Sequence, residues 1–187
     1  MAFELNATSK IKNITQAYDG PRFRDGRPKV DGDIVERMRL VTVEEAWGVL
    51  MGKGHQFQFD GEWINLHPER VIVGRAVTAR YIPFRQDFND VVQAEGERHN
   101  RVGGQNSWVI DTLVKNDVLV VDLFGKVLRG TFIGDNLGTA IATNTGGTGL
   151  IVDGSIRDDH RVRQLDMNVL CRGLHPSAIG EVTMAEM

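Results

Sequence analysis

Two short groups of residues carry the types and the spacing that could do chemistry. The first group, Gly134-Asp135-Asn136-Leu137, follows an apolar run and opens a predicted helix. The free backbone N–H groups and the dipole at such a helix N-terminus can hold a carboxylate or a phosphate. Asp135 is also a residue type that caps helices, so its presence alone does not identify an anion site.

The second group, Gly154-Ser155-Ile156-Arg157-Asp158-Asp159, places a guanidinium beside two carboxylates. Arg157 can bind an oxyanion or stabilise negative charge that develops on one. Asp158 or Asp159 can supply hard oxygen ligands to Mg²⁺ or Mn²⁺, which often keep several waters and few protein carboxylates. The alternative is a surface turn with internal ion pairs. Both groups fall in loops next to predicted buried strands, where α/β folds place ligand sites.

Other signals for catalysis are weak. The glycine-rich segment 146–149 lacks a following Lys-Ser/Thr and precedes a strand, so a helix C-cap and turn is expected there. The five histidines show no metal-ligand spacing, which disfavours a zinc site. Cys171 lies in an apolar run and is expected in the core. The absence of a G-x-S-x-G sequence disfavours a serine hydrolase.

An alternation of strands and helices typical of α/β domains must position these groups. A capping box at Thr42 and Glu45 predicts a short helix after Thr42. In the predicted helix over 107–115, the core candidates are Trp108, Ile110, Leu113 and Val114. Strands are predicted at 71–81, 118–122, 150–153 and 169–171, with further helices at 87–98, 136–144 and from 162 onward.

Residues 1–41 are predicted to form an N-terminal arm, and residues 42–187 one domain. Residues 1–40 hold eight Lys or Arg and six Asp or Glu, and the stretch 19–28 consists of turn formers and charges. Interleaved acidic residues favour a solvated or interface segment, laid over a neighbour, rather than a contact with nucleic acid.

The overall composition excludes several classes of protein. The 187 residues include 22 Lys or Arg and 25 Asp or Glu, for a formal net charge of −3, which argues against a nucleic-acid partner. No apolar run approaches the roughly 20 residues that span a bilayer, so no membrane association is expected. A single cysteine excludes an internal disulfide, and the N-terminus lacks the pattern of a secretory signal. A cytoplasmic location is therefore expected.

The order and spacing of these motifs resemble the RraA-like family. This family contains the class II 4-hydroxy-4-methyl-2-oxoglutarate aldolases and the regulators of ribonuclease E activity. Its shared pattern is Gly-Asp, a spacer of about twenty residues, and Arg-Asp, which matches Gly134-Asp135 and Arg157-Asp158 here. The likeness extends over most of the chain, through the segments 73–78, 117–122, 149–154 and 173–176.

The resemblance implies an α/β/β sandwich of the swivelling-domain type, with subunits that assemble in a ring as a homotrimer or homohexamer. By position, Asp158 is the expected ligand of Mg²⁺ or Mn²⁺, with Asp159 less favoured. Arg157 is the expected stabiliser of a pyruvate enolate, and Asp135 is expected to position a catalytic water. The residues expected to bind the substrate are Gly134, Asp135, Asn136, Leu137 and Arg157.

The implied function is a metal-dependent lyase that cleaves or decarboxylates a short 2-oxo acid through a pyruvate enolate, with oxaloacetate decarboxylation as a side activity. The alternative is a non-catalytic regulator that binds a ribonuclease or helicase. Two features depart from the pattern. The aldolases carry Asp or Glu three positions after the metal aspartate, where this chain has Arg161. Family members also continue past the His-Pro with further strands, so C-terminal strands are expected to be missing here.

Overall fold

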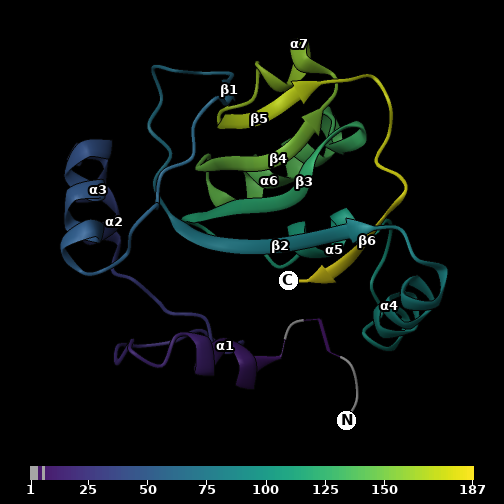
Figure 1. Cartoon of the computed structure of the whole chain (residues 1–187), viewed down its shortest axis with the longest axis horizontal. Coiled ribbons are helices and arrows are strands. Elements are labelled where there is room, and N and C mark those ends of the chain that lie inside the picture. The colour runs from purple at the N-terminus through teal and green to yellow at the C-terminus, as the bar shows by residue number, and fades with distance from the viewer. Residues whose placement is uncertain (1–3, 6) are drawn as a thin grey trace.

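A six-stranded sheet organises the chain in the computed structural model, which describes residues 4, 5 and 7–187 (Figure 1). Residues 1–3 and 6 of the predicted arm lie outside the described residues. The spatial order of the strands is β1-β5-β4-β3-β2-β6. The strands are β1 (Ile64–Asn65), β2 (Arg75–Pro83), β3 (Asp117–Ile133), β4 (Gly149–Ile156), β5 (Asn168–Leu174) and β6 (Val182–Glu186).

The four central strands, β2 to β5, run parallel, and each edge strand runs antiparallel to its neighbour. Buried residues such as Leu119, Val121, Leu150 and Val152 fill β3 and β4, as expected of parallel strands covered on both faces. The predicted α/β class is therefore confirmed. Cys171 is buried on β5, and burial raises the pKa of its thiol to about 11.

All four predicted strands have different bounds in the structure, and the differences are largest for two of them. The strand predicted from 71 begins at Arg75, because the ladder between β2 and β3 starts where Arg75 pairs with Asp117. The strand predicted over 118–122 continues to Ile133, although its pairing with β4 shifts register beyond Asp122. Phe124 has a positive φ there, and such an irregular conformation hides a continuing strand from a periodicity argument.

A strand also follows the His175-Pro176 segment. Val182 to Glu186 form β6, which pairs antiparallel with β2 and buries Thr183 and Met184. The sheet therefore receives one strand after the His-Pro segment, and the expectation that further C-terminal strands are missing stays a prediction. The short length of β6 explains why the sequence pattern did not indicate it.

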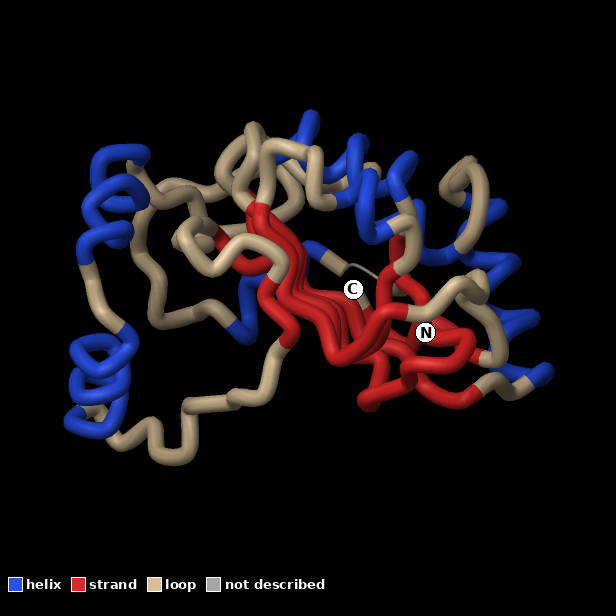
Figure 2. The backbone as a smooth tube through the Cα atoms, turned by 90° about the horizontal axis from the view of Figure 1, so that it is seen from above, coloured by secondary structure: helices blue, strands red, loops and turns tan. Residues whose placement is uncertain are grey.

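The helices flank the sheet at several places (Figures 1 and 2). The predicted capping box is confirmed, since Thr42 Oγ1 accepts from the Glu45 N–H and Glu45 accepts from the Thr42 N–H. The helices among the described residues are α1 (Thr8–Ile14), α2 (Gly32–Arg37), the 3₁₀ helix η1 (Met38–Leu40), α3 (Val43–Gly52), α4 (Gln86–Arg98), α5 (Gln105–Ile110), α6 (Asp135–Thr145) and α7 (Asp159–Val162).

Helix α5 is shorter than predicted and begins earlier. It ends at Ile110 instead of 115, and the chain then turns so that the Val114 N–H donates to Asp117 Oδ2 over 2.9 Å. Val114 is 38% exposed, so its assignment to the core is wrong, whereas Trp108, Ile110 and Leu113 are buried. Helix α7 likewise begins at Asp159, before the predicted position 162.

The N-terminal segment lies on this chain's own sheet. Arg27 Nη1 donates to Asp117 Oδ2 over 2.8 Å at the start of β3, and Lys10 on α1 forms an ion pair with Glu186 on β6. By contrast, α2 and α3 stand away from the sheet in Figure 1. Helix α3 contains no buried residue, and Val43, Trp47, Val49 and Met51 are exposed on it. No helix among the described residues is long and apolar enough to cross a bilayer.

Candidate active site

The two groups singled out in the sequence meet at the carboxyl ends of the neighbouring parallel strands β3 and β4. Ile133 ends β3 and pairs with Ile156, which ends β4. The backbone N–H of Arg157 donates to the Ile133 carbonyl over 3.0 Å, which fixes the second loop against the first. The fold therefore brings Gly134 and Arg157 together in the place where α/β sheets bind ligands.

Gly134 permits this close approach. A Cβ at this position would collide with Asp158 Oδ2 and would lie 3.0 Å from Arg157 Nε. Its φ of −118° is accessible to any residue, so the requirement for glycine is spatial and not conformational. The glycine of the Gly-Asp motif thus makes room for the arginine and aspartate of the Arg-Asp motif.

Helix α6 begins at this contact. Gly134 occupies the N-cap position and Asp135 is the first helical residue, so the alternative of Asp135 as the N-cap is wrong. The Asp135 N–H points to Asp158 Oδ2 over 3.4 Å, and the Asn136 N–H donates to Asp135 Oδ1 over 3.0 Å. The positive end of the α6 dipole therefore faces the carboxylate of Asp158.

A small pocket of about 100 Å³ opens beside the helix N-terminus. All five residues expected to bind the substrate line it, so the structure brings the predicted set together, while their role in binding stays a prediction. The pocket is closed on other sides by residues of β3, of α5 and of the connection from β5 to β6, among them Asn106, Thr131, Phe132, Ala178 and Ile179.

No local pattern in the sequence indicates that Asn106 is part of this site. Asn106 lies on α5 and is buried, and its Nδ2 donates to the Phe132 carbonyl over 2.8 Å. That hydrogen bond joins segments that are far apart in the chain, so only the tertiary fold places Asn106 at the pocket. Ala178 and Ile179 reach it through the connection that precedes β6.

Each aspartate of the site has an arginine near it. Asp135 Oδ2 accepts from Arg161 Nη1 over 2.8 Å, Asp159 Oδ1 accepts from Arg163 Nε over 2.8 Å, and Asp158 Oδ2 lies 3.5 Å from Arg157 Nε. The ion pairs of the surface-turn alternative are therefore present, together with the pocket. The hydrogen bond from Arg161 lowers the pKa of Asp135.

Asp158 is the carboxylate best placed for a cation. Its contact with Arg157 is longer than the ion pairs that hold Asp135 and Asp159, and its side chain is 37% exposed. Its φ of 56° is left-handed, a conformation that Asp tolerates better than most residues. Asp159 starts α7 and is held by Arg163, and neither Asp158 nor Asp159 is part of the pocket lining itself.

The described residues contain no group of three or more His, Cys, Asp or Glu side chains that could enclose a metal ion. Asp158 alone is compatible with Mg²⁺ or Mn²⁺ only if water and substrate oxygens complete the shell. Mg²⁺ commonly binds in this way, through one or two carboxylates. The residues present therefore fit a metal site in which Asp158, water and substrate oxygens together hold the ion, rather than a site enclosed by protein side chains.

A family model described as RraA-like (Aldolase/RraA) matches residues 34–186. The chain belongs to the RraA-like family. The match includes both loops of the pocket and excludes α1 and the loop that follows it. No curated protein sequence matches the chain.

Solved structures agree with this assignment of the RraA-like fold. Streptomyces coelicolor RraAS2, described as an unusual member of the RNase ES inhibitor RraA protein family, is 25% identical with a TM-score of 0.60. That alignment covers 85% of this chain and 72% of RraAS2. An uncharacterized protein from Pseudomonas syringae pv. tomato is 19% identical with a TM-score of 0.60, and the alignment covers 89% of this chain and 67% of that protein.

Proposed function

We propose that this RraA-like chain is a divalent-metal-dependent lyase that acts on a short 2-oxo acid. The observation that carries the proposal is the meeting of Arg157 with the N-terminus of α6 at one small pocket, next to Asp158, whose Oδ2 lies 3.4 Å from the Asp135 backbone nitrogen. A helix N-terminus binds a carboxylate, and a guanidinium beside it can stabilise an oxyanion. A small 2-oxo acid presents both groups on adjacent carbon atoms.

In the proposed reaction, the α6 N-terminus holds the substrate carboxylate and Arg157 faces the 2-oxo oxygen. For oxaloacetate, the bond between C3 and C4 breaks, CO₂ leaves, and the electron pair forms the enolate of pyruvate. Arg157 stabilises the negative charge on the enolate oxygen, and water then protonates C3. Asp158 would hold the metal ion, which supplies Lewis-acid polarisation of the 2-oxo group when bound.

The Arg161–Asp135 ion pair favours decarboxylation over aldol cleavage. Aldol cleavage of a 4-hydroxy-2-oxo acid requires a base for the 4-hydroxyl proton, whereas loss of CO₂ does not. Because Arg161 lowers the pKa of Asp135, this carboxylate is a poor base near neutral pH. We therefore propose oxaloacetate-type 2-oxo acids as the better substrates and 4-hydroxy-4-methyl-2-oxoglutarate as a slower one.

Release of pyruvate from oxaloacetate and from 4-hydroxy-4-methyl-2-oxoglutarate tests the proposal. EDTA should abolish turnover, and Mg²⁺ or Mn²⁺ should restore it. Arg157→Ala should lower the rate on the order of 10²-fold, as for a lost oxyanion donor. Arg80→Ala is the matched control, because Arg80 pairs with Asp122 away from the pocket. Full turnover of Arg157→Ala and Asp158→Ala variants would show that the assignment is wrong.

We also propose assembly as a homotrimer or homohexamer, through a contact that includes the exposed face of α3. An apolar helix face with no buried residue usually marks an interaction surface. Light scattering should give a trimer or hexamer mass, and Trp47→Glu should reduce it. An unchanged mass for the Trp47→Glu variant would show that α3 is not part of the subunit contact.

Regulation of a ribonuclease is the second candidate function. The likeness to RraAS2, whose family inhibits RNase ES, and the exposed face of α3 both favour it. It predicts no turnover on a panel of 2-oxo acids, together with direct binding to a purified RNase E-type enzyme that Trp47→Glu weakens. Metal-dependent turnover without such binding would favour the lyase.

A further inference from the structure

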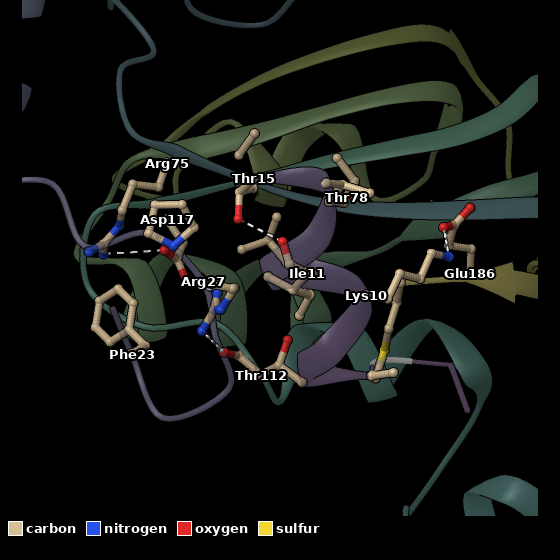
Figure 3. A pocket seen from close by; sticks show the side chains of 16 residues that line it. Lys10, Ile11, Thr15, Phe23, Arg27, Arg75, Thr78, Thr112, Asp117 and Glu186 are labelled. Carbon is tan, nitrogen blue, oxygen red and sulfur yellow. Dashed lines mark hydrogen bonds and ion pairs between the residues drawn. The ribbon is translucent and has the colours of Figure 1, made fainter. Parts of the chain in front are cut away.

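A second pocket lies between helix α1 and strand β2 (Figure 3). Its volume is about 350 Å³, compared with about 100 Å³ at the candidate active site, and the two pockets share no lining residue. Apolar side chains, including Ile11, Ile14, Phe23 and Val77, make up much of its wall. A mostly apolar pocket with a few polar groups is the usual form of a small-molecule site.

The pocket depends on residues that the RraA-like family match does not include. That match begins at residue 34, whereas one wall consists of α1 and the loop that ends near Pro28. The same loop is tied to the sheet by Arg27, which donates to Asp117 and to the Thr112 carbonyl. The pocket is therefore formed by the N-terminal segment of this chain together with the family core.

One end of the pocket is polar and buried. Figure 3 shows Arg27, Arg75 and Phe23 grouped around Asp117. The Asp117 side chain is 1% exposed, with Oδ2 2.8 Å from Arg27 Nη1 and Oδ1 3.2 Å from Arg75 Nη2. The Arg75 guanidinium lies 4.6 Å from the centre of the Phe23 ring, so the ring packs against the guanidinium at the pocket wall.

The charges at this end balance. Arg27 also pairs over 2.6 Å with Asp25, which does not line the pocket, so the two guanidinium groups are matched by the carboxylates of Asp117 and Asp25. A further charge brought into this apolar pocket would lack a counter-ion, and its desolvation would be costly. A ligand group at this end should therefore be neutral.

Two buried atoms at this end have no hydrogen-bond partner among the described residues. They are Arg75 Nε, a donor, and Asp117 Oδ1, an acceptor whose 3.2 Å contact with Arg75 Nη2 is an ion pair without hydrogen-bond geometry. Such atoms are rare in folded proteins, because burial without a partner costs free energy. A group that both accepts and donates, such as a primary amide or a hydroxyl, would match the pair.

We propose that this pocket binds a small aliphatic molecule with a neutral polar head, a primary amide or an alcohol. The head lies at Arg75 and Asp117, and the aliphatic tail runs between Ile11 and Val77. At the other end, the ion pair between Lys10 and Glu186 joins α1 to β6, and both side chains are partly exposed. The tail end therefore faces the solvent.

The test compares three probes of equal chain length: hexanamide, hexanoate and hexylammonium. Binding to the full chain is followed by the NMR shifts of backbone amides in α1 and β2. Hexanamide should bind saturably and at least about tenfold more tightly than either charged probe, since only the amide avoids an unpaired buried charge. Saturable binding of none of the three, or a preference for a charged probe, would overturn the proposal.

Two substitutions locate the ligand. Ala76→Leu places a larger side chain in the pocket and should weaken hexanamide binding at least tenfold. Ala94→Leu is the matched control, because Ala94 is an exposed residue of α4 that lines neither pocket. Equal affinities of these two variants would place the ligand elsewhere. Arg157→Ala should leave hexanamide binding unchanged, which separates this pocket from the candidate active site.

A third substitution tests the charge argument. Asp117→Asn removes one of the two carboxylates and leaves one guanidinium unbalanced. The preference for hexanamide over hexanoate should then fall or reverse. An unchanged ratio in a folded Asp117→Asn variant would show that charge balance does not select the head group. If that variant does not fold, the Ala76→Leu comparison still decides whether this pocket is the binding site.

Discussion

Arg161 Nη1 donates a hydrogen bond to Asp135 Oδ2 over 2.8 Å and so joins helix α7 to the first residue of helix α6. The aldolase pattern carries an acidic residue at the position of Arg161. This chain therefore has a positive charge beside Asp135, a residue of the pocket lining, where that pattern has a negative one. The same contact raises the pKa of Arg161 and lowers the pKa of Asp135.

Arg161→Glu should shift the balance between the two proposed reactions. Without the guanidinium, Asp135 regains basicity, and the site regains the acid of the aldolase pattern. We expect the rate of aldol cleavage, divided by the rate of decarboxylation, to rise by about tenfold or more. This is less than the rate enhancement of about 10²-fold or more that a general base usually contributes. The measurement is pyruvate release from 4-hydroxy-4-methyl-2-oxoglutarate and from oxaloacetate. A ratio that stays constant would exclude Asp135 as the base.

The Arg161–Asp135 pair should also affect stability in acid. Because the pKa of Asp135 is lower in the folded protein than its ordinary value of 3.8, the ionised carboxylate favours the folded state above that pH. This contribution is lost as the pH falls through the lowered pKa. Melting curves should be compared from about pH 2 to 6 for Arg161→Gln and for the original chain. The melting temperature of the variant should be the lower one above about pH 4, and the difference should shrink at lower pH. Curves that differ equally at all pH values would point to a cause other than titration of Asp135.

Asp158→Asn should remove the metal-dependent rate. It keeps the shape of the side chain but takes away the charge that a divalent cation requires, so turnover should fall on the order of 10²-fold. Binding of Mn²⁺, followed by its electron paramagnetic resonance signal, should weaken in parallel. Asp159→Asn is the matched control, since Asp159 pairs with Arg163, whereas Asp158 Oδ2 faces the Asp135 N–H at the start of α6. Equal losses in both variants would contradict the assignment of Asp158.

Gly134→Ala should damage the site without a cost in backbone conformation. The added methyl group would displace the Asp158 carboxylate and crowd Arg157, so we expect at least about a tenfold loss of turnover from the misplaced groups. Gly48→Ala provides the control, because no heavy atom outside its helix lies within 4 Å of a Cβ there. Full activity of Gly134→Ala would mean that Asp158 does not need its present position.

The sequence was informative where a local pattern determines the structure. The buried strands at Val118 and Leu150 follow from continuous apolar runs, and the capping box at Thr42 follows from its four-residue pattern. The meeting of Gly134 with Arg157 could be anticipated, because the carboxyl ends of neighbouring parallel strands lie together.

Features that depend on distant contacts could not be predicted in the same way. Asn106 joins the pocket through its hydrogen bond to the Phe132 carbonyl, and no local pattern encodes that pairing. The apolar pattern over 107–115 predicts too long a helix, because the turn at Val114 depends on a hydrogen bond to Asp117, a residue of the next strand. The Arg161–Asp135 ion pair similarly joins two helices that β4 separates in the chain.

The place of β6 in the sheet has a consequence for synthesis on the ribosome. This strand pairs with β2, although β3, β4 and β5 all lie between them in the chain. During translation, the backbone N–H and C=O groups on that side of β2 lack their strand partner until Val182 to Glu186 have emerged. A nascent chain stalled before this point would expose an open strand edge, to which chaperones and other nascent chains can bind.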